Sequence, residues 1–105
     1  MSTPFAFIAD LAQQAADAPS DSIISRTIFT GDQIKAILFS FAPGQELSEH
    51  TAARPAILHF VSGQARLTLG GEEMTAVPNT WVHMPAQLPH SVYADTEVKM
   101  LLILL

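Results

Sequence analysis

The fold is decided by residues 56–77, which read AILHFVSGQARLTLGGEEMTAV. Two breaks that contain glycine, at residues 62–64 and 70–71, divide this stretch into three short runs. Runs of this length, rich in apolar residues, predict β-strands, and glycine at the breaks predicts tight turns between them. The middle run, 65–69, alternates strictly between apolar and polar residues, which indicates a strand with one buried face.

The same signal continues on both sides of this stretch. Further runs of this kind are Ile23 to Phe29, Ile34 to Phe41, Trp81 to Met84, His90 to Ala94 and Val98 to Leu104. About eight or nine strands at such regular spacing are typical of an all-β sandwich or barrel. Because 105 residues suffice for one core but not two, we expect a single domain over 1–105, with the barrel at about 22–105.

The first residues carry a helical signal instead. Apolar residues recur at helical spacing between Pro4, which suits a first turn, and Pro19, which ends the pattern. Ser2 or Thr3 can supply the N-cap. We therefore expect a short helix over about residues 4–17, packed on the outside of the barrel or across a subunit contact. It contains no lysine or arginine, which argues against an anionic membrane surface.

Composition limits the partners. Apolar residues make up 49% of the chain and charged residues 14%, which excludes disorder and predicts a homodimer that covers part of the apolar surface. Ten acidic residues oppose five scattered basic ones, which argues against a nucleic-acid partner. The chain has no cysteine, lacks the features of a secretory signal, and has no apolar run long enough to span a bilayer. We expect a cytoplasmic protein with no membrane partner.

Two histidine-containing phrases carry the functional signal. The first begins at Gly44, continues after five residues with His50, and reaches Gly63 through Ala52 and Ala56. It resembles the first motif of the cupin superfamily, which reads glycine, five residues, His-x-His, three or four residues, Glu, six residues, Gly. The spacing is complete, but alanine stands where the family has its second histidine and its glutamate.

The second phrase surrounds His90. In the cupin superfamily the second motif reads glycine, five residues, Pro-x-Gly, two residues, His, three residues, Asn, and it falls here on Asn79, Pro85, Gln87, His90 and Ala94. Only the proline and the histidine are retained. The resemblance covers most of the chain and implies a cupin-type double-stranded β-helix, a jelly-roll barrel, with degenerate metal-binding motifs.

The resemblance also implies where ligands would bind. In the family, the two motifs hold one divalent metal, usually iron, manganese, nickel or zinc, inside the barrel. Since only His50 and His90 remain here, we expect such a metal to be absent or weakly bound. On extended strands, positions 50, 52 and 56 share the inward face, so Ala52 and Ala56 leave a gap. His59 is an odd step from Ala56 and could replace a ligand only through a β-bulge.

Three functions are compatible with these residues. We favour a binding module in which a small organic ligand places an acid or hydroxyl on His50 and His90, with Ala52 and Ala56 making room. The first alternative is a metal-dependent enzyme of the oxygenase or isomerase type, in which a substrate carboxylate or His59 completes the metal sphere. The second is a structural or regulatory dimer whose barrel is filled by side chains. The sequence by itself names neither substrate nor reaction.

Overall fold

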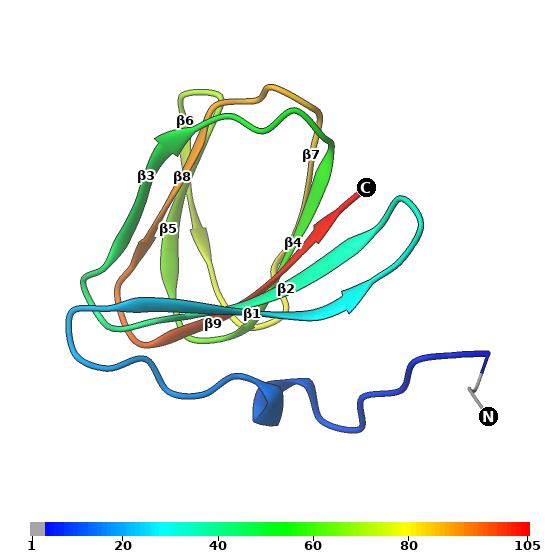
Figure 1. The fold of residues 1–105 in the computed structure, drawn as a ribbon. Helices are drawn as coiled ribbons and strands as arrows, with labels where there is room; N and C mark the ends of the chain where they lie inside the picture. The colour runs from blue at the N-terminus through cyan, green and yellow to red at the C-terminus, as the bar shows by residue number, and fades with distance from the viewer. Residues whose placement is uncertain (1–3) are drawn as a thin grey trace.

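The protein is an antiparallel β-barrel built from two facing sheets (Figure 1). The computed structural model describes residues 4–105, and within them it contains nine strands. They are β1 Ile23–Thr30, β2 Lys35–Phe41, β3 Glu46–His50, β4 Ala56–Ser62, β5 Ala65–Leu69, β6 Glu72–Ala76, β7 Trp81–Met84, β8 His90–Ala94 and β9 Val98–Leu104. One sheet has the order β1-β2-β9-β4-β7 and the other β3-β8-β5-β6. The predicted all-β jelly roll is confirmed.

One apolar core fills the space between the sheets. Both sheets contribute fully buried side chains to it, among them Phe41, Phe60 and Met100 from the five-stranded sheet and Leu67 and Val92 from the other. These residues occupy alternate positions of their strands, as expected where only one face of each sheet turns inward. The alternation that predicted the strands therefore also determines the core.

The last strand is apolar on both faces because both of its faces are covered. β9 lies at the centre of the five-stranded sheet, between β2 and β4. Val98 and Met100 belong to the core, whereas Leu101 belongs to a second apolar cluster together with Ala15 and Leu38. A strand covered on both sides reads as a continuous apolar run.

The helix expected over residues 4–17 is not formed. Only Leu11–Gln14 is helical, as a single 3-10 turn within an otherwise irregular segment, which we call the N-terminal strap (residues 4–21). The strap runs along the outside of the five-stranded sheet (Figure 1). The N-cap expected at Ser2 or Thr3 lies outside the described residues.

Weak burial explains why this segment does not form a longer helix. Short helices are marginal in water and gain most of their stability from packing an apolar face. Phe5 and Phe7 are 67% and 79% exposed, so the first part of the strap buries little, and only Ala15 is buried, against Leu38 and Leu101. Over the described chain, no helix is long and apolar enough to cross a membrane.

Candidate functional site

The candidate site lies at one open end of the barrel. The β3–β4 connection (residues 51–55) and the β7–β8 connection (residues 85–89) meet at this end (Figure 1). The backbone amide of Gln87 donates a hydrogen bond to the backbone carbonyl of Ala52 at 2.8 Å, and this bond holds the two connections together. We call residues 50–56 and 84–90 the barrel mouth.

The two motif histidines are neighbours at this mouth. His50 on β3 is paired in register with His90 on β8, and their ring centroids are 4.2 Å apart at an interplanar angle of 56°. A β-bulge between Leu47 and His50 makes this possible. Leu47 packs on the core, so in a regular strand His50, three residues later, would point outward. The extra residue of the bulge turns it inward.

The histidine pair borders a small cavity of about 50 Å³. The residues that line it are His50, Ala52, Arg54, Ala56, Met84, Pro85, Leu88, His90, Leu102 and Leu104. The structure therefore brings together His50, Ala52, Ala56 and His90, the four predicted pocket residues. Strand alternation was expected to place these residues on one face. It does not explain their arrangement, because residues 51–55 form an irregular connection.

Hydrogen bonds orient both imidazole rings. Nδ1 of His50 lies 2.8 Å from the Ser48 carbonyl oxygen, and Nδ1 of His90 lies 2.9 Å from that of Leu88. A carbonyl oxygen can only accept, so each Nδ1 carries the proton and donates. In the neutral ring Nε2 is then unprotonated. As neutral rings, both histidines thus offer Nε2 as an acceptor at the far end of the ring from the backbone.

The donor set at the mouth does not by itself fit a resident metal ion. Two imidazole nitrogens are present, and Ala52 and Ala56 offer no donor atom in place of the family's other ligands. Throughout residues 4–105 there is no group of three or more histidine, cysteine, aspartate or glutamate side chains placed to hold a metal. A protein site for a catalytic zinc ordinarily supplies three ligands.

His59 is not brought to the histidine pair. It alternates on β4 with the buried residues Ala56, Leu58 and Phe60, so its side chain is on the outer face of the sheet. The pairing of β4 with β9 is regular from Ala56 to Phe60 and shifts only after Phe60. No bulge of the kind that would turn His59 inward is present before it.

Arg54 is the residue at the mouth that the sequence interpretation missed. Its Nε donates to the Leu105 main-chain oxygen at 2.9 Å, and its Nη2 donates to the Gln33 carbonyl at 2.9 Å. A weaker contact joins Nη2 to the Leu104 carbonyl at 3.5 Å. The sequence contains one indication that Arg54 belongs to the site, because Arg54 lies midway between Ala52 and Ala56, the two motif positions occupied by alanine. Its acceptors, however, are distant in sequence.

The backbone of the two motifs is retained where side chains differ. Asn79 and Gln87 occupy the two glycine positions of the second motif and have φ of 77° and 67°. This left-handed conformation is easy for glycine and uncommon for other residues, although asparagine tolerates it well. Gln87 therefore keeps the turn that aims the β7–β8 connection at Ala52.

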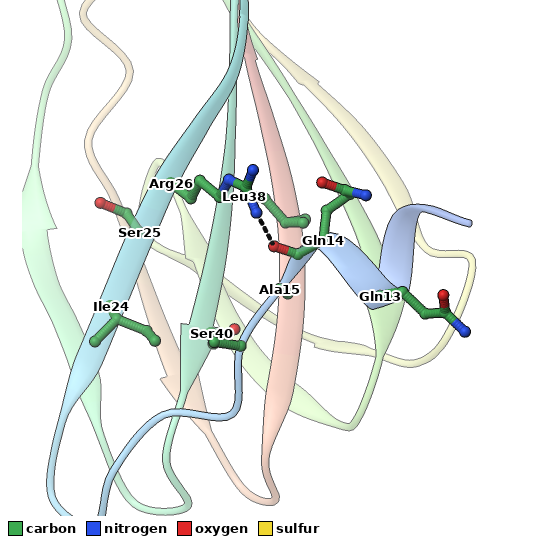
Figure 2. Close-up of a pocket in the computed structure, with 9 residues that line it drawn as sticks. Gln13, Gln14, Ala15, Ile24, Ser25, Arg26, Leu38 and Ser40 are labelled. Atoms are coloured by element: carbon green, nitrogen blue, oxygen red, sulfur yellow. Dashed lines mark hydrogen bonds between the residues drawn. The ribbon is translucent and has the colours of Figure 1, made fainter. Parts of the chain in front are cut away.

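A larger hollow, of about 340 Å³, lies outside the barrel between the N-terminal strap and the sheet. Figure 2 shows Arg26 beside it, and its Nη1 donates to the Gln14 carbonyl at 3.4 Å. Leu38 and Ser40 contribute to the hollow from β2 (Figure 2). It contains no residue of either motif, so we assign the site to the barrel mouth.

Arg66, whose pKa is shifted, also lies away from the mouth. The pKa of Arg66 is raised by its hydrogen bond to Asp95, with Nη2 and Oδ1 3.0 Å apart. The same guanidinium lies over the Tyr93 ring, 4.6 Å from its centroid. This exposed cluster lies on the outer face of the four-stranded sheet, because Arg66 and Tyr93 are paired there.

The barrel and its mouth define the class of protein. Two antiparallel sheets closed around one core, with a histidine from each motif at the open end, form a small double-stranded β-helix. The family pattern described as Cupin domain matches residues 37–104. The chain belongs to the cupin family.

Solved structures agree with this assignment. A cupin superfamily protein from Desulfitobacterium hafniense is 26% identical, with a TM-score of 0.86 over 97% of this chain and 93% of that one. A conserved protein of unknown function from Streptococcus pyogenes is 29% identical, with a TM-score of 0.84 over 98% of this chain and 90% of that one. None of the curated proteins matches this chain.

A more distant structural match shows the fold only. A variant of salicylate 1,2-dioxygenase from Pseudoaminobacter salicylatoxidans is 12% identical, with a TM-score of 0.75 over 89% of this chain and 29% of that one. The same barrel fold thus also occurs in an oxygenase. One fold supports many chemistries, so the activity of this relative does not transfer with the barrel.

Proposed function

We propose that this cupin binds a small organic ligand at the barrel mouth, through the Nε2 atoms of His50 and His90. The orientation of the two rings is the observation that supports this most directly. Both Nδ1 atoms are used by backbone carbonyls, and the two Nε2 atoms are left as acceptors. His90 is only 7% exposed, so few water molecules compete with a ligand for its Nε2.

The size of the cavity limits how the ligand enters. The core fills the barrel interior, and the space at the mouth is about 50 Å³. One water molecule takes about 30 Å³ of liquid volume, so the cavity admits one end of a ligand of a few non-hydrogen atoms. The rest of a larger ligand would lie over Ala52 and the β3–β4 connection.

Native mass spectrometry of untagged protein tests the proposal. We expect a copurifying small molecule that is lost from His50→Ala and from His90→Ala, while both variants keep their circular dichroism spectrum. His83→Ala is the matched control, because His83 is an exposed strand histidine outside the mouth. Retention of the molecule by both mouth variants would place the ligand elsewhere and refute the proposal.

The metal-dependent enzyme is the second candidate. It is supported by the same two Nε2 atoms, which in neutral imidazoles are good ligands for iron, manganese, nickel or zinc. Two further ligands would have to come from water or from a bound acid. Metal analysis by mass spectrometry, on protein purified without nickel resin, separates the candidates. About one metal per chain, lost from His50→Ala and His90→Ala, would favour the enzyme.

We also propose a homodimer, in line with the high apolar content. Apolar side chains that are exposed in the single chain support it, with Trp81 60% and Val77 48% exposed. Light scattering after gel filtration tests it, and a monomer at micromolar concentration would refute it. A structural dimer without a ligand is the third candidate, and it predicts no copurifying molecule and no metal. The cytoplasmic location stays a prediction.

A further inference from the structure

Arg54 is held at the mouth with part of its guanidinium unused. Its Nε and Nη2 donate to main-chain oxygens of Leu105, Gln33 and Leu104. These contacts come from the β1–β2 turn and from the end of β9, so they fix the plane of the group. For Nη1, by contrast, residues 4–105 provide no hydrogen-bond partner. Two N–H donors on a half-buried, oriented guanidinium therefore remain available.

Within residues 4–105, no acidic side chain is paired with Arg54 either. The ion pairs of the described chain join Arg66 to Asp95 and Lys99 to Asp17, and none involves Arg54. No aspartate or glutamate is among the described residues that line the cavity. The side chains at the mouth thus carry a positive formal charge, although the protein as a whole carries -5. A cavity of this kind favours an anionic group, and guanidinium binds carboxylates well.

We infer that the ligand of the mouth is a short hydroxy carboxylic acid, whose carboxylate binds Nη1 of Arg54 and whose hydroxyl donates to Nε2 of His90. The inference rests on the proposed function, because it names the ligand of the same cavity. His50 is exposed, so water can satisfy its Nε2. A carboxylate and one adjacent carbon suit a cavity of about 50 Å³.

The rest of the lining disfavours two related ligand classes. An amino acid would bring an ammonium group as the donor to His90, but this adds a second positive charge beside Arg54, where no acidic side chain of the described lining compensates it. A simple carboxylate has no hydroxyl to donate to Nε2 of His90. The remaining wall is apolar, with Met84, Leu88 and Leu102 among its residues, and it suits a short hydrocarbon portion.

Three small probes, applied to the full-length protein, test the carboxylate contact and the hydroxyl contact separately. Glycolate carries both groups, acetate carries only the carboxylate, and 1,2-ethanediol carries only hydroxyls. Ligand-observed NMR titration up to tens of millimolar gives their affinities. We expect glycolate to bind at least about tenfold more tightly than 1,2-ethanediol, since a hydrogen bond to a charged group contributes about one to two factors of ten. It should bind about two- to tenfold more tightly than acetate, since a hydrogen bond between neutral groups contributes up to about one factor of ten.

Variants assign the two contacts. Arg54→Gln should lower glycolate affinity about tenfold or more and leave 1,2-ethanediol unchanged, and Arg54→Lys should restore part of the loss. Arg26→Gln is the matched control, because Arg26 is an exposed arginine outside the mouth. Thermal melting shows whether loss of the Arg54 contacts loosens the fold. The wild-type comparison of glycolate with acetate does not depend on that outcome.

The outcomes separate this inference from the proposed function. If 1,2-ethanediol binds as well as glycolate and both are lost from His90→Ala, the mouth is a ligand site and the carboxylate assignment is wrong. If glycolate binding depends on Arg54 but is unchanged in His50→Ala and His90→Ala, the histidine-based proposal fails. If wild-type protein binds none of the three probes, the inference is overturned.

Discussion

Replacing Gly63 with alanine should be among the most damaging single-methyl changes in this protein. Gly63 ends the first motif and lies in the β4–β5 turn with φ of 87°. A Cβ at this position would lie 2.0 Å from the Glu97 carbonyl oxygen and 2.9 Å from Val98 Cα. These are main-chain atoms, so no side-chain rotation relieves the clash.

Hydrogen bonds hold the β8–β9 turn (residues 95–97), which faces Gly63, in place. The backbone amides of Asp95 and Thr96 donate to the backbone carbonyl of Gln64 at 2.9 and 3.3 Å. The backbone amide of Gln64 donates to Thr96 Oγ1 at 3.0 Å. Left-handed backbone costs a residue with a Cβ about 1–2 kcal/mol, and forced displacement of packed atoms costs about 1–3 kcal/mol more. We expect Gly63→Ala to lower the free energy of unfolding by about 2–5 kcal/mol.

Gly71→Ala is the matched control. Gly71 has φ of 88°, and no heavy atom lies within 4 Å of a Cβ placed there, so this variant should cost only the backbone term of about 1–2 kcal/mol. Urea unfolding and thermal melting compare the two variants. The steric term of about 1–3 kcal/mol should make their melting temperatures differ by about 4 °C or more. Equal losses of stability in the two variants would refute the steric reasoning.

Four further predictions concern the mouth and the N-terminal strap. Gln87→Gly should raise the free energy of unfolding by about 0.5 kcal/mol, because relief of left-handed backbone strain slightly exceeds the added entropy of glycine in the unfolded chain. A lower free energy of unfolding in urea titrations would contradict this. Ala15→Asp should lower it by about 1–2 kcal/mol and speed proteolysis of the strap, since Ala15 is 8% exposed against apolar neighbours. Ala56→Phe should abolish glycolate binding by NMR without changing the oligomeric state, because the ring exceeds the space at the mouth. His59→Ala should leave glycolate affinity unchanged, and a tenfold loss would mean that His59 reaches the site.

The strand pattern was predictable because it depends on local chemistry. Alternating apolar residues between glycine-containing turns predicted the strands from Ile23 onward, and eight of the nine observed strands correspond to predicted runs. The helix over residues 4–17 was wrong for a reason that lies outside the segment. Helical periodicity predicts a helix only where a surface exists to bury its apolar face, and the first half of the strap has little such cover.

The candidate site was predictable in part. Motif spacing brought His50, Ala52, Ala56 and His90 into one hypothesis, and the structure brings them to one cavity. The inward direction of His50, however, depends on a β-bulge that the residues before it do not signal. Period-two reasoning holds only where a strand is regular.

Taken alone, the sequence determined the all-β class, the position of the turns, and the loss of two of the four motif ligands, because each depends on residues close together in the chain. The tertiary structure decided which way each ring of the histidine pair points and that Arg54 joins it. Arg54 is oriented by main-chain oxygens near residues 33 and 105, and such contacts form only when the sheets close. The chemistry of the mouth therefore follows from barrel closure as much as from the motifs.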